Sequence, residues 1–250
     1  MGWTRLGTAT PSEKTKKVEM TTQYYQDSQF AKTYQDLVAR EDYEENLLPA
    51  IQKISPLRDK AILELGAGTG RISCFLAPYT SSLIATDLSC FMLSRGKNIL
   101  LKLGLDNWHL TLASHQALPF SSNTFDIIIS GWSFHGVALD SPNNWQPALA
   151  QALTGVARVL RPGGKVILIE SLGTGFETPH PPAVLADYLV GLKAHGFTST
   201  WIRTDYCFKD KAEAQDLTTF FFGDAPMPMW ETEKGVIVPE CTGLWWKTFK

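Results

Sequence analysis

The chain reads AILELGAGTGRI from Ala61 to Ile72, and this stretch is its most informative local pattern. Its apolar first half predicts a buried strand, glycines follow at positions 66, 68 and 70, and residues 71–78 then show a helical pattern. Glycine adopts positive φ without a Cβ penalty and lets the backbone approach a ligand closely. The start of the helix offers free N–H groups. The stretch therefore predicts a nucleotide-type ligand over the carboxyl end of a first strand.

The spacing of the glycines departs from that of dinucleotide-binding proteins. Their fingerprint is G-x-G-x-x-G, whereas here Gly66, Gly68 and Gly70 alternate and Arg71 stands at the place of the third glycine. Glu64, two residues before the first glycine, suits a cationic amine better than a pyrophosphate. A lone glycine-rich turn is a weak signal, so the rest of the chain has to support it.

Strand and helix patterns alternate beyond this turn and predict an α/β protein with a Rossmann-like, doubly wound sheet. The expected strands are 61–65, 83–86, 109–112, 125–130 and 165–170, and the expected helices are 71–78, 91–103 and 146–160. Residues 171–182 read as a long loop, and 183–195 and 210–222 as helices. Residues 198–204, and either 236–239 or 244–249, are candidates for two late strands.

The residues before the first strand predict a helical cap. Apolar side chains recur at helical spacing over residues 21–54, whereas residues 1–20 are polar and read as a loose tail. We therefore expect a tail and cap over residues 1–58 and the core over 59–250, with 172–250 a variable region on the acceptor side.

Composition restricts the partners and the compartment. The 250 residues are 44% hydrophobic, which suffices for a large core, and the net charge of −2 argues against a nucleic-acid partner. No apolar run approaches the roughly 18 residues of a membrane span. The cysteines show no metal-ligand spacing and read as reduced thiols, so we expect a cytoplasmic protein without a metal and without a membrane partner. They are Cys74, Cys90, Cys207 and Cys241.

Several motifs resemble those of the class I S-adenosylmethionine-dependent methyltransferases over about residues 59–171. The stretch from Glu64 to Gly70 matches motif I of that family, E/D-x-G-x-G-x-G, and Asp87 ends the expected second strand. ALPF at residues 117–120 and RPGG at 161–164 resemble stretches of its small-molecule members, such as the ubiquinone- and menaquinone-biosynthesis enzymes. The resemblance implies a seven-stranded, mostly parallel sheet with helices on both faces. It also implies methyl transfer to a small molecule by in-line displacement.

The resemblance also assigns roles to residues. The cofactor, S-adenosylmethionine, is expected at Glu64, Gly66, Ala67, Gly68, Asp87, Leu88, Ser114, His115, Leu118 and Ser130. The acceptor pocket is expected at Tyr25, Trp132 and Glu170, and His135 is the candidate catalytic base. Ser114 stands where the family usually has an acidic residue facing the adenine, which weakens that contact. Core packing is the alternative for Leu88, Leu118 and Trp132, and a structural hydrogen bond is the alternative for His135.

Other functions remain open at this point. A nicotinamide-dependent oxidoreductase is disfavoured by the missing G-x-G-x-x-G spacing. A non-catalytic S-adenosylmethionine-binding regulatory subunit is suggested by Ser114, and a protein methyltransferase would need an open acceptor groove. Neither the acceptor, nor the methylated atom (O, N, S or C), nor the oligomeric state follows from the sequence.

Overall fold

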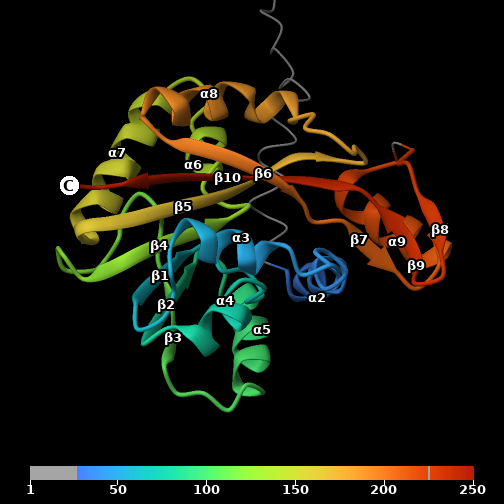
Figure 1. Cartoon of the computed structure of the whole chain (residues 1–250), viewed down its shortest axis with the longest axis horizontal. Helices are drawn as coiled ribbons and strands as arrows, with labels where there is room; N and C mark the ends of the chain where they lie inside the picture. The colour runs from blue at the N-terminus through green and yellow to red at the C-terminus, as the bar shows by residue number, and fades with distance from the viewer. Residues whose placement is uncertain (1–26, 225) are drawn as a thin grey trace, which may run out of the picture.

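A computed structural model describes residues 27–224 and 226–250, and within them an α/β core carries a small lobe at one side (Figure 1). The core sheet has seven strands in the order β3-β2-β1-β4-β5-β10-β6. Its strands are β1 Ala61–Leu65, β2 Ser82–Asp87, β3 Trp108–Leu112, β4 Phe125–Gly131, β5 Leu160–Thr174, β6 Thr198–Arg203 and β10 Glu240–Thr248. The pairs among β1 to β5 are parallel, and only β10 runs antiparallel to its neighbours β5 and β6. The predicted mostly parallel, doubly wound sheet is confirmed.

Helices cover both faces of this sheet (Figure 1). One face carries α3 Leu47–Ile54, α4 Ser73–Leu76, η1 Ala77–Tyr79 and α5 Cys90–Leu101. The other carries α6 Gly136–Leu139, α7 Trp145–Val159, η2 Ala183–Leu185 and α8 Ala186–Ala194. Strand β4 shows why the sheet is central: Ile128 belongs to the hydrophobic cluster under α7 and α8, and Ile127 and Ile129 to the cluster under α3. All three are at most 1% exposed, as expected for a strand covered on both faces.

Two helices precede β1 among the described residues, and one of them, α3, covers the sheet. Helix α2, Ser28–Val38, begins where Asp27 Oδ1 accepts hydrogen bonds from the backbone N–H groups of Gln29 (2.6 Å) and Phe30 (2.9 Å). It packs against α5 and against the lobe. The connection from α2 to α3 turns sharply, with positive φ at Asp42 and Glu45.

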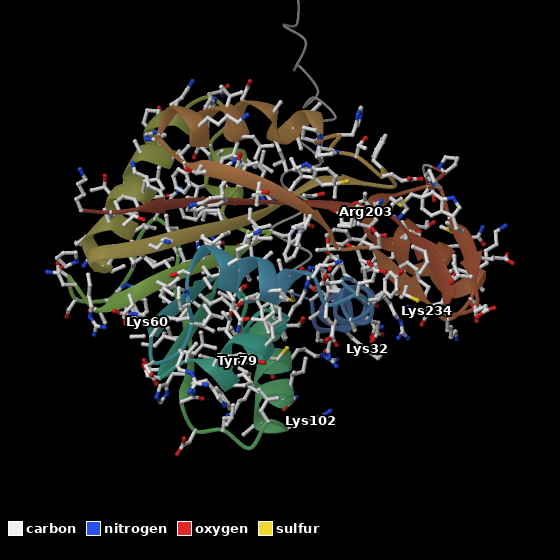
Figure 2. All side chains as sticks on the ribbon, viewed as in Figure 1. Lys32, Lys60, Tyr79, Lys102, Arg203 and Lys234 are labelled. Carbon is white, nitrogen blue, oxygen red and sulfur yellow. The ribbon has the colours of Figure 1, made fainter. Side chains whose placement is uncertain are left out.

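The lobe is an insertion between β6 and β10 (Figure 1). Its elements are β7 Tyr206–Phe208, α9 Lys211–Phe222, β8 Trp230–Thr232 and β9 Gly235–Val238. The three strands form a separate antiparallel sheet in the order β7-β9-β8. Figure 2 shows Arg203 where the chain leaves the core sheet for this lobe.

The structure corrects two expectations for the C-terminal third. The sequence predicts one late strand, at either 236–239 or 244–249. In the structure both regions form strands, the first in β9 of the lobe and the second in β10 of the core sheet. The loop expected over 171–182 begins only after Thr174, because Ser171 and Thr174 still pair with β10. No helix among the described residues has the length and apolarity to cross a membrane.

Candidate active site

The glycine-rich turn after β1 is built for close contact. Gly66 has φ +70°, and a Cβ placed there would lie 1.9 Å from Oγ of Ser133, so only glycine fits beneath the segment that follows β4. Ala67 is buried and donates its N–H to the carbonyl of Thr86 at 2.8 Å, which ties the turn to β2. Gly68 has more room, because the atom nearest to a Cβ placed on it would be 3.4 Å away.

Two carboxyl groups lie on either side of this turn. Glu64, on β1, is 1% exposed and accepts a short hydrogen bond from the hydroxyl of Ser73. Asp87, at the end of β2, accepts hydrogen bonds from the backbone N–H groups of Gly68 and Ser89, both at 2.8 Å. Asp87 therefore fixes the turn, while each of its oxygens keeps a second lone pair for a ligand hydroxyl.

Burial sets the ionisation of both carboxyl groups. It raises the pKa of Glu64 to about 8; the hydrogen bond from Ser73 lowers that pKa in part, and the charge of Asp87 raises it. Burial also raises the pKa of Asp87, against the lowering effect of its backbone hydrogen bonds. Among the described residues no cation pairs with the buried carboxyl group of Glu64, and a ligand amine would stabilise its charged form.

Four other residues expected at the cofactor occupy different environments. Leu88 is 60% exposed beside the turn, whereas Leu118 is buried in the core under α7. The hydroxyl of Ser114 accepts the backbone N–H of Gln116 at 3.2 Å. Ser130 is fully buried, and its hydroxyl donates to the carbonyl of Leu65 at 2.9 Å, so it ties β4 to β1. Of these four residues, Leu88 and Ser114 have side chains that are at least partly accessible.

His115 faces the segment that follows β4. Its Nε2 lies 2.9 Å from Oγ of Ser133, and its ring stacks on Phe134 with centroids 5.7 Å apart. Burial, with a further contribution from His135, lowers the pKa of His115 to about 4, so the imidazole is neutral at physiological pH. His115 and Ser133 together cover Gly66.

His135 and Glu170, predicted separately as base and pocket residue, form a pair. Nδ1 of His135 lies 2.6 Å from Oε2 of Glu170, and the backbone N–H of His135 donates to Oε1 at 3.2 Å. The hydroxyl of Tyr188, on α8, donates to the same Oε1 at 2.9 Å. Burial lowers the pKa of His135, but the charge and hydrogen bond of Glu170 outweigh it, and the net pKa is raised. The Glu170 side chain is fully buried, whereas that of His135 is 25% exposed.

Trp132 lies in a strained position beside the glycine-rich turn. Its φ is +50°, which is rare for a bulky residue and marks a constrained segment. The guanidinium of Arg71 stacks on its ring, 3.6 Å from the centroid. Arg71 also pairs with Glu41, Nη1 to Oε2 at 2.6 Å. Tyr25, the third expected pocket residue, lies outside the described residues.

Sequence reasoning missed several polar residues that the fold gathers here. Arg71 had a signal, since it directly follows the motif, but Glu41, Ser133, Tyr188 and Glu240 belong to no motif and reach the site through tertiary packing alone. Among the described residues, no group of three or more His, Cys, Asp or Glu side chains is arranged to hold a metal ion.

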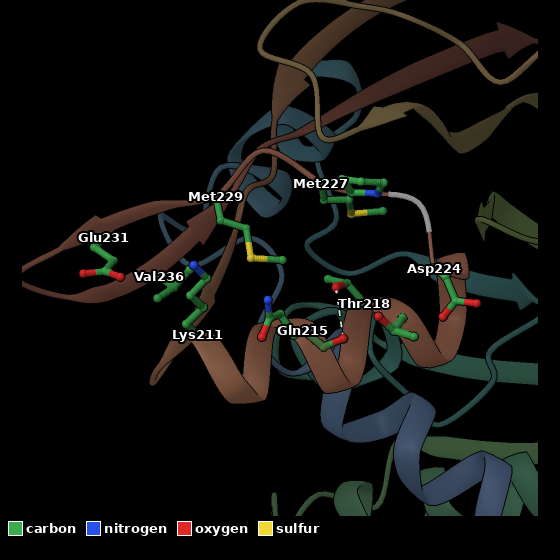
Figure 3. A pocket seen from close by; sticks show the side chains of 10 residues that line it. Lys211, Gln215, Thr218, Asp224, Met227, Met229, Glu231 and Val236 are labelled. Atoms are coloured by element: carbon green, nitrogen blue, oxygen red, sulfur yellow. Dashed lines mark hydrogen bonds between the residues drawn. The ribbon is translucent and has the colours of Figure 1, made fainter.

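A hollow of about 480 Å³ lies in the lobe, between α9 and the segment leading to β8 (Figure 3). Thr218 lies on its floor and Met227 and Met229 lie above it (Figure 3). It shares no residue with the sites predicted from the sequence.

Comparison with known proteins agrees with this geometry. A family model described as a methyltransferase domain matches residues 62–164. Demethylmenaquinone methyltransferase of Clavibacter sepedonicus is 31% identical over 141 residues, which are 56% of this chain and 51% of that protein. The ubiquinone/menaquinone biosynthesis C-methyltransferase of Hahella chejuensis is 28% identical over 177 residues, 65% of either chain. The chain thus spans about half to two thirds of the length of these curated relatives.

Solved structures share the fold. A SAM-dependent methyltransferase from Aquifex aeolicus is 17% identical, with a TM-score of 0.53 over 88% of this chain and 97% of that one. The YcgJ protein of Bacillus subtilis is 16% identical, with a TM-score of 0.52 over 81% of this chain and 97% of that one. Residues 62–164 thus match a methyltransferase domain, and the strand order agrees with the fold that this chain shares with the solved SAM-dependent methyltransferase.

Proposed function

We propose that this protein transfers a methyl group from S-adenosylmethionine to a small-molecule acceptor. One observation carries the proposal: the cofactor-type turn with its buried Glu64 meets, through Ser133, the segment that presents His135. A transfer to an acceptor atom that carries a proton uses both a methyl donor and a proton acceptor. The quinone-methylating activity named for the curated relatives supports a small-molecule acceptor.

The residues around the glycine-rich turn fit the cofactor. Glu64 is a buried carboxyl group whose charged form a cation would stabilise, and it would bind the amino group of S-adenosylmethionine. Asp87 would accept hydrogen bonds from the ribose hydroxyls, and Leu88 and Ser114 would contact the adenine. When bound, S-adenosylmethionine supplies an activated methyl group. The chain's contribution is alignment of donor and acceptor, which can account for roughly 7–11 kcal/mol of a barrier.

We propose His135 as the general base. Its Nδ1 side is engaged by Glu170, which favours the tautomer with the proton on Nδ1 and leaves a lone pair on Nε2. Glu170 stabilises the imidazolium that forms when Nε2 takes a proton from the acceptor, and this is why the pKa of His135 is raised. Tyr188 holds Glu170 in place from α8. Trp132 then belongs to the wall of the acceptor pocket, whereas Glu170, which is fully buried, acts on the acceptor only through His135.

The proposal places the protein in the cytoplasm with its thiols reduced. The four cysteines are free. They are also spread over both the core and the lobe, and free thiols are usual in a reducing compartment.

Calorimetric titration with S-adenosylhomocysteine tests the cofactor assignment. We expect one-to-one binding in the micromolar range and a loss of at least tenfold in affinity for Asp87→Ala. Glu231→Gln, on the exposed strand β8, is the control and retains the affinity. Unchanged affinity in Asp87→Ala would remove the ribose assignment, and an absence of binding by the native protein would refute the proposed function.

A second experiment tests the base once an acceptor has been found by screening. His135→Gln should lower kcat by about 10²–10⁴ with little change in the affinity for S-adenosylhomocysteine. His195→Gln, at the end of α8, is the matched control. A kcat for His135→Gln equal to that of the control at saturating acceptor would make His135 a structural residue.

A further inference from the structure

A buried polar cluster lies where the core sheet meets the lobe, and neither the cofactor site nor the base uses it. We call it the Glu240 cluster, and it consists of Glu41, Arg71, Trp132, Tyr206 and Glu240. Arg203, labelled in Figure 2, marks the same junction, because its partner Asp205 also accepts the backbone N–H of Glu240 at 3.0 Å.

One half of the cluster is an internal ion pair. Glu41 is 9% exposed and binds Nη1 of Arg71. Thr204, itself 2.5 Å from Thr242, donates to the other oxygen of Glu41 at 3.4 Å. Nη2 of Arg71 is buried and has no hydrogen-bond partner among the described residues. Nη2 carries two N–H groups, so the guanidinium keeps both of these donors unused.

The other half is a carboxyl group with an unused oxygen. Glu240 is 1% exposed, and its Oε1 accepts the hydroxyl of Ser171 at 2.7 Å. Its Oε2 is buried and makes no hydrogen bond of ordinary geometry in the described part of the chain, although the hydroxyl of Thr174 is near enough to lower the pKa of Glu240. Native proteins leave few buried polar atoms unsatisfied, and such an atom calls for an explanation, of which a ligand is one.

The cluster adjoins the proposed cofactor site. Arg71 directly follows the glycine-rich turn, and Trp132 directly follows β4. Tyr34 of α2 links the two sites: a Cβ built on Gly68 would lie 3.9 Å from its ring, and the charges of both Arg71 and Asp87 influence its pKa. A molecule held by the cluster would therefore lie next to the cofactor, where an acceptor belongs.

The charges favour one chemical class. Two carboxyl groups face a single guanidinium that is already paired with one of them. An ammonium group at Oε2 of Glu240 would balance the second carboxylate. An anionic acceptor would meet two carboxyl groups, and only the unpaired Nη2 of Arg71 would favour it.

We propose that the Glu240 cluster binds a protonated amino group of the methyl acceptor, with Oε2 of Glu240 as its hydrogen-bond acceptor. This inference rests on the proposed function, because the acceptor is defined by the methyl transfer. It names a recognition group and leaves open which atom of the acceptor is methylated.

Proton linkage gives the inference a distinctive signature. Burial, reinforced by the charge of Glu41, raises the pKa of Glu240 to about 8. At pH 7 the free carboxyl group thus holds a proton, and an arriving ammonium group displaces it to the solvent. Arg71 and Tyr206 also face this region, and neither loses a proton near pH 7, because the pKa of each is raised.

The test is calorimetric titration of the protein saturated with S-adenosylhomocysteine. The probes are primary amines from methylamine to 2-phenylethylamine, each compared with the alcohol of the same size, in two pH 7 buffers of different ionisation enthalpy. We expect at least one amine to bind tenfold or more tightly than its alcohol, with release of up to one proton. In Glu240→Gln that preference and the proton release should disappear while S-adenosylhomocysteine still binds; Glu231→Gln should retain both.

The outcomes separate the inference from the proposed function. Failure of S-adenosylhomocysteine to bind would refute the function itself. Three results would overturn the inference alone, each with normal S-adenosylhomocysteine binding. They are that no amine binds, that amines and alcohols bind equally tightly, or that the preference for amines persists in Glu240→Gln. The comparison of amine with alcohol on the native protein keeps the test decisive even if the variant does not fold.

Discussion

Replacement of Glu64 by glutamine should stabilise the ligand-free protein, by an amount that grows with pH. The carboxyl group of Glu64 is 1% exposed, and burial raises its pKa from 4.5 to about 8. Between these two values the folded state keeps a proton that the unfolded chain has lost. Stability therefore falls as the pH rises from about 4.5 to 8, and it levels off above that range.

The size of the effect follows from the same pKa values. Each pH unit within the window corresponds to about 1.4 kcal/mol, so the ionisation of Glu64 removes about 3–4 kcal/mol of stability between pH 5 and pH 8. Glutamine does not titrate, and its side-chain oxygen can still accept the hydroxyl of Ser73. For a chain of this length, that difference corresponds to about 10 °C in Tm.

The assay is thermal unfolding by circular dichroism at pH 5 and pH 8 without ligand. We expect the Tm of Glu64→Gln to exceed that of the native protein by about 10 °C more at pH 8 than at pH 5. Glu231→Gln, on exposed β8, controls for the loss of a surface carboxylate. A difference between Glu64→Gln and the native protein that does not change with pH would refute the reasoning, because it would mean that Glu64 ionises normally in the folded state.

Two further predictions concern packing. Gly66→Ala places a Cβ 1.9 Å from the hydroxyl oxygen of Ser133 at a residue with positive φ, so it should lower Tm and abolish S-adenosylhomocysteine binding. Gly104→Ala is the control, because Gly104 has φ +64° but no atom within 4 Å of such a Cβ, and it should lower Tm less. Equal shifts in Tm would mean that backbone strain alone matters. Thr204→Val removes a buried hydroxyl that donates to Glu41, a member of the Glu240 cluster, and it should lower the free energy of urea unfolding by about 1–3 kcal/mol. Thr219→Val, exposed on α9, should lower it by almost nothing, and a value near zero for both variants would show that the hydroxyl network adds no stability.

The sequence sufficed for the parts of the molecule that depend on local pattern. The strand, the glycine-rich turn and Asp87 lie within 27 residues, and their roles in positioning each other follow from the geometry of a single βαβ unit. The alternation of strands and helices predicted the sheet for the same reason. Ser130 and Leu118 show the limit: nothing local distinguishes a hydroxyl or a leucine that binds a ligand from one that joins strands or fills the core.

Contacts between distant segments could not be predicted. Arg71 and Glu41 pair because a sharp turn after α2 brings the glutamate back over the core, and that turn carries no recognisable signature. Glu170 and Tyr188 meet only because α8 packs across the end of β5. Glu240 depends on the pairing of β10 with β5, which an antiparallel return through the lobe makes possible. Each of these contacts can be identified only once the tertiary fold is known.

The place of β10 has a consequence for how the molecule assembles. Strands β5 and β6 are never neighbours, since β10 lies between them and pairs with both. On a ribosome, β6 emerges before β10, with the whole lobe between the two. Until β10 has been made, the nascent sheet ends at β5 and β6 has no partner in it. We therefore expect β1 to β5 to fold first, and the region around Glu240 to form only in the last step.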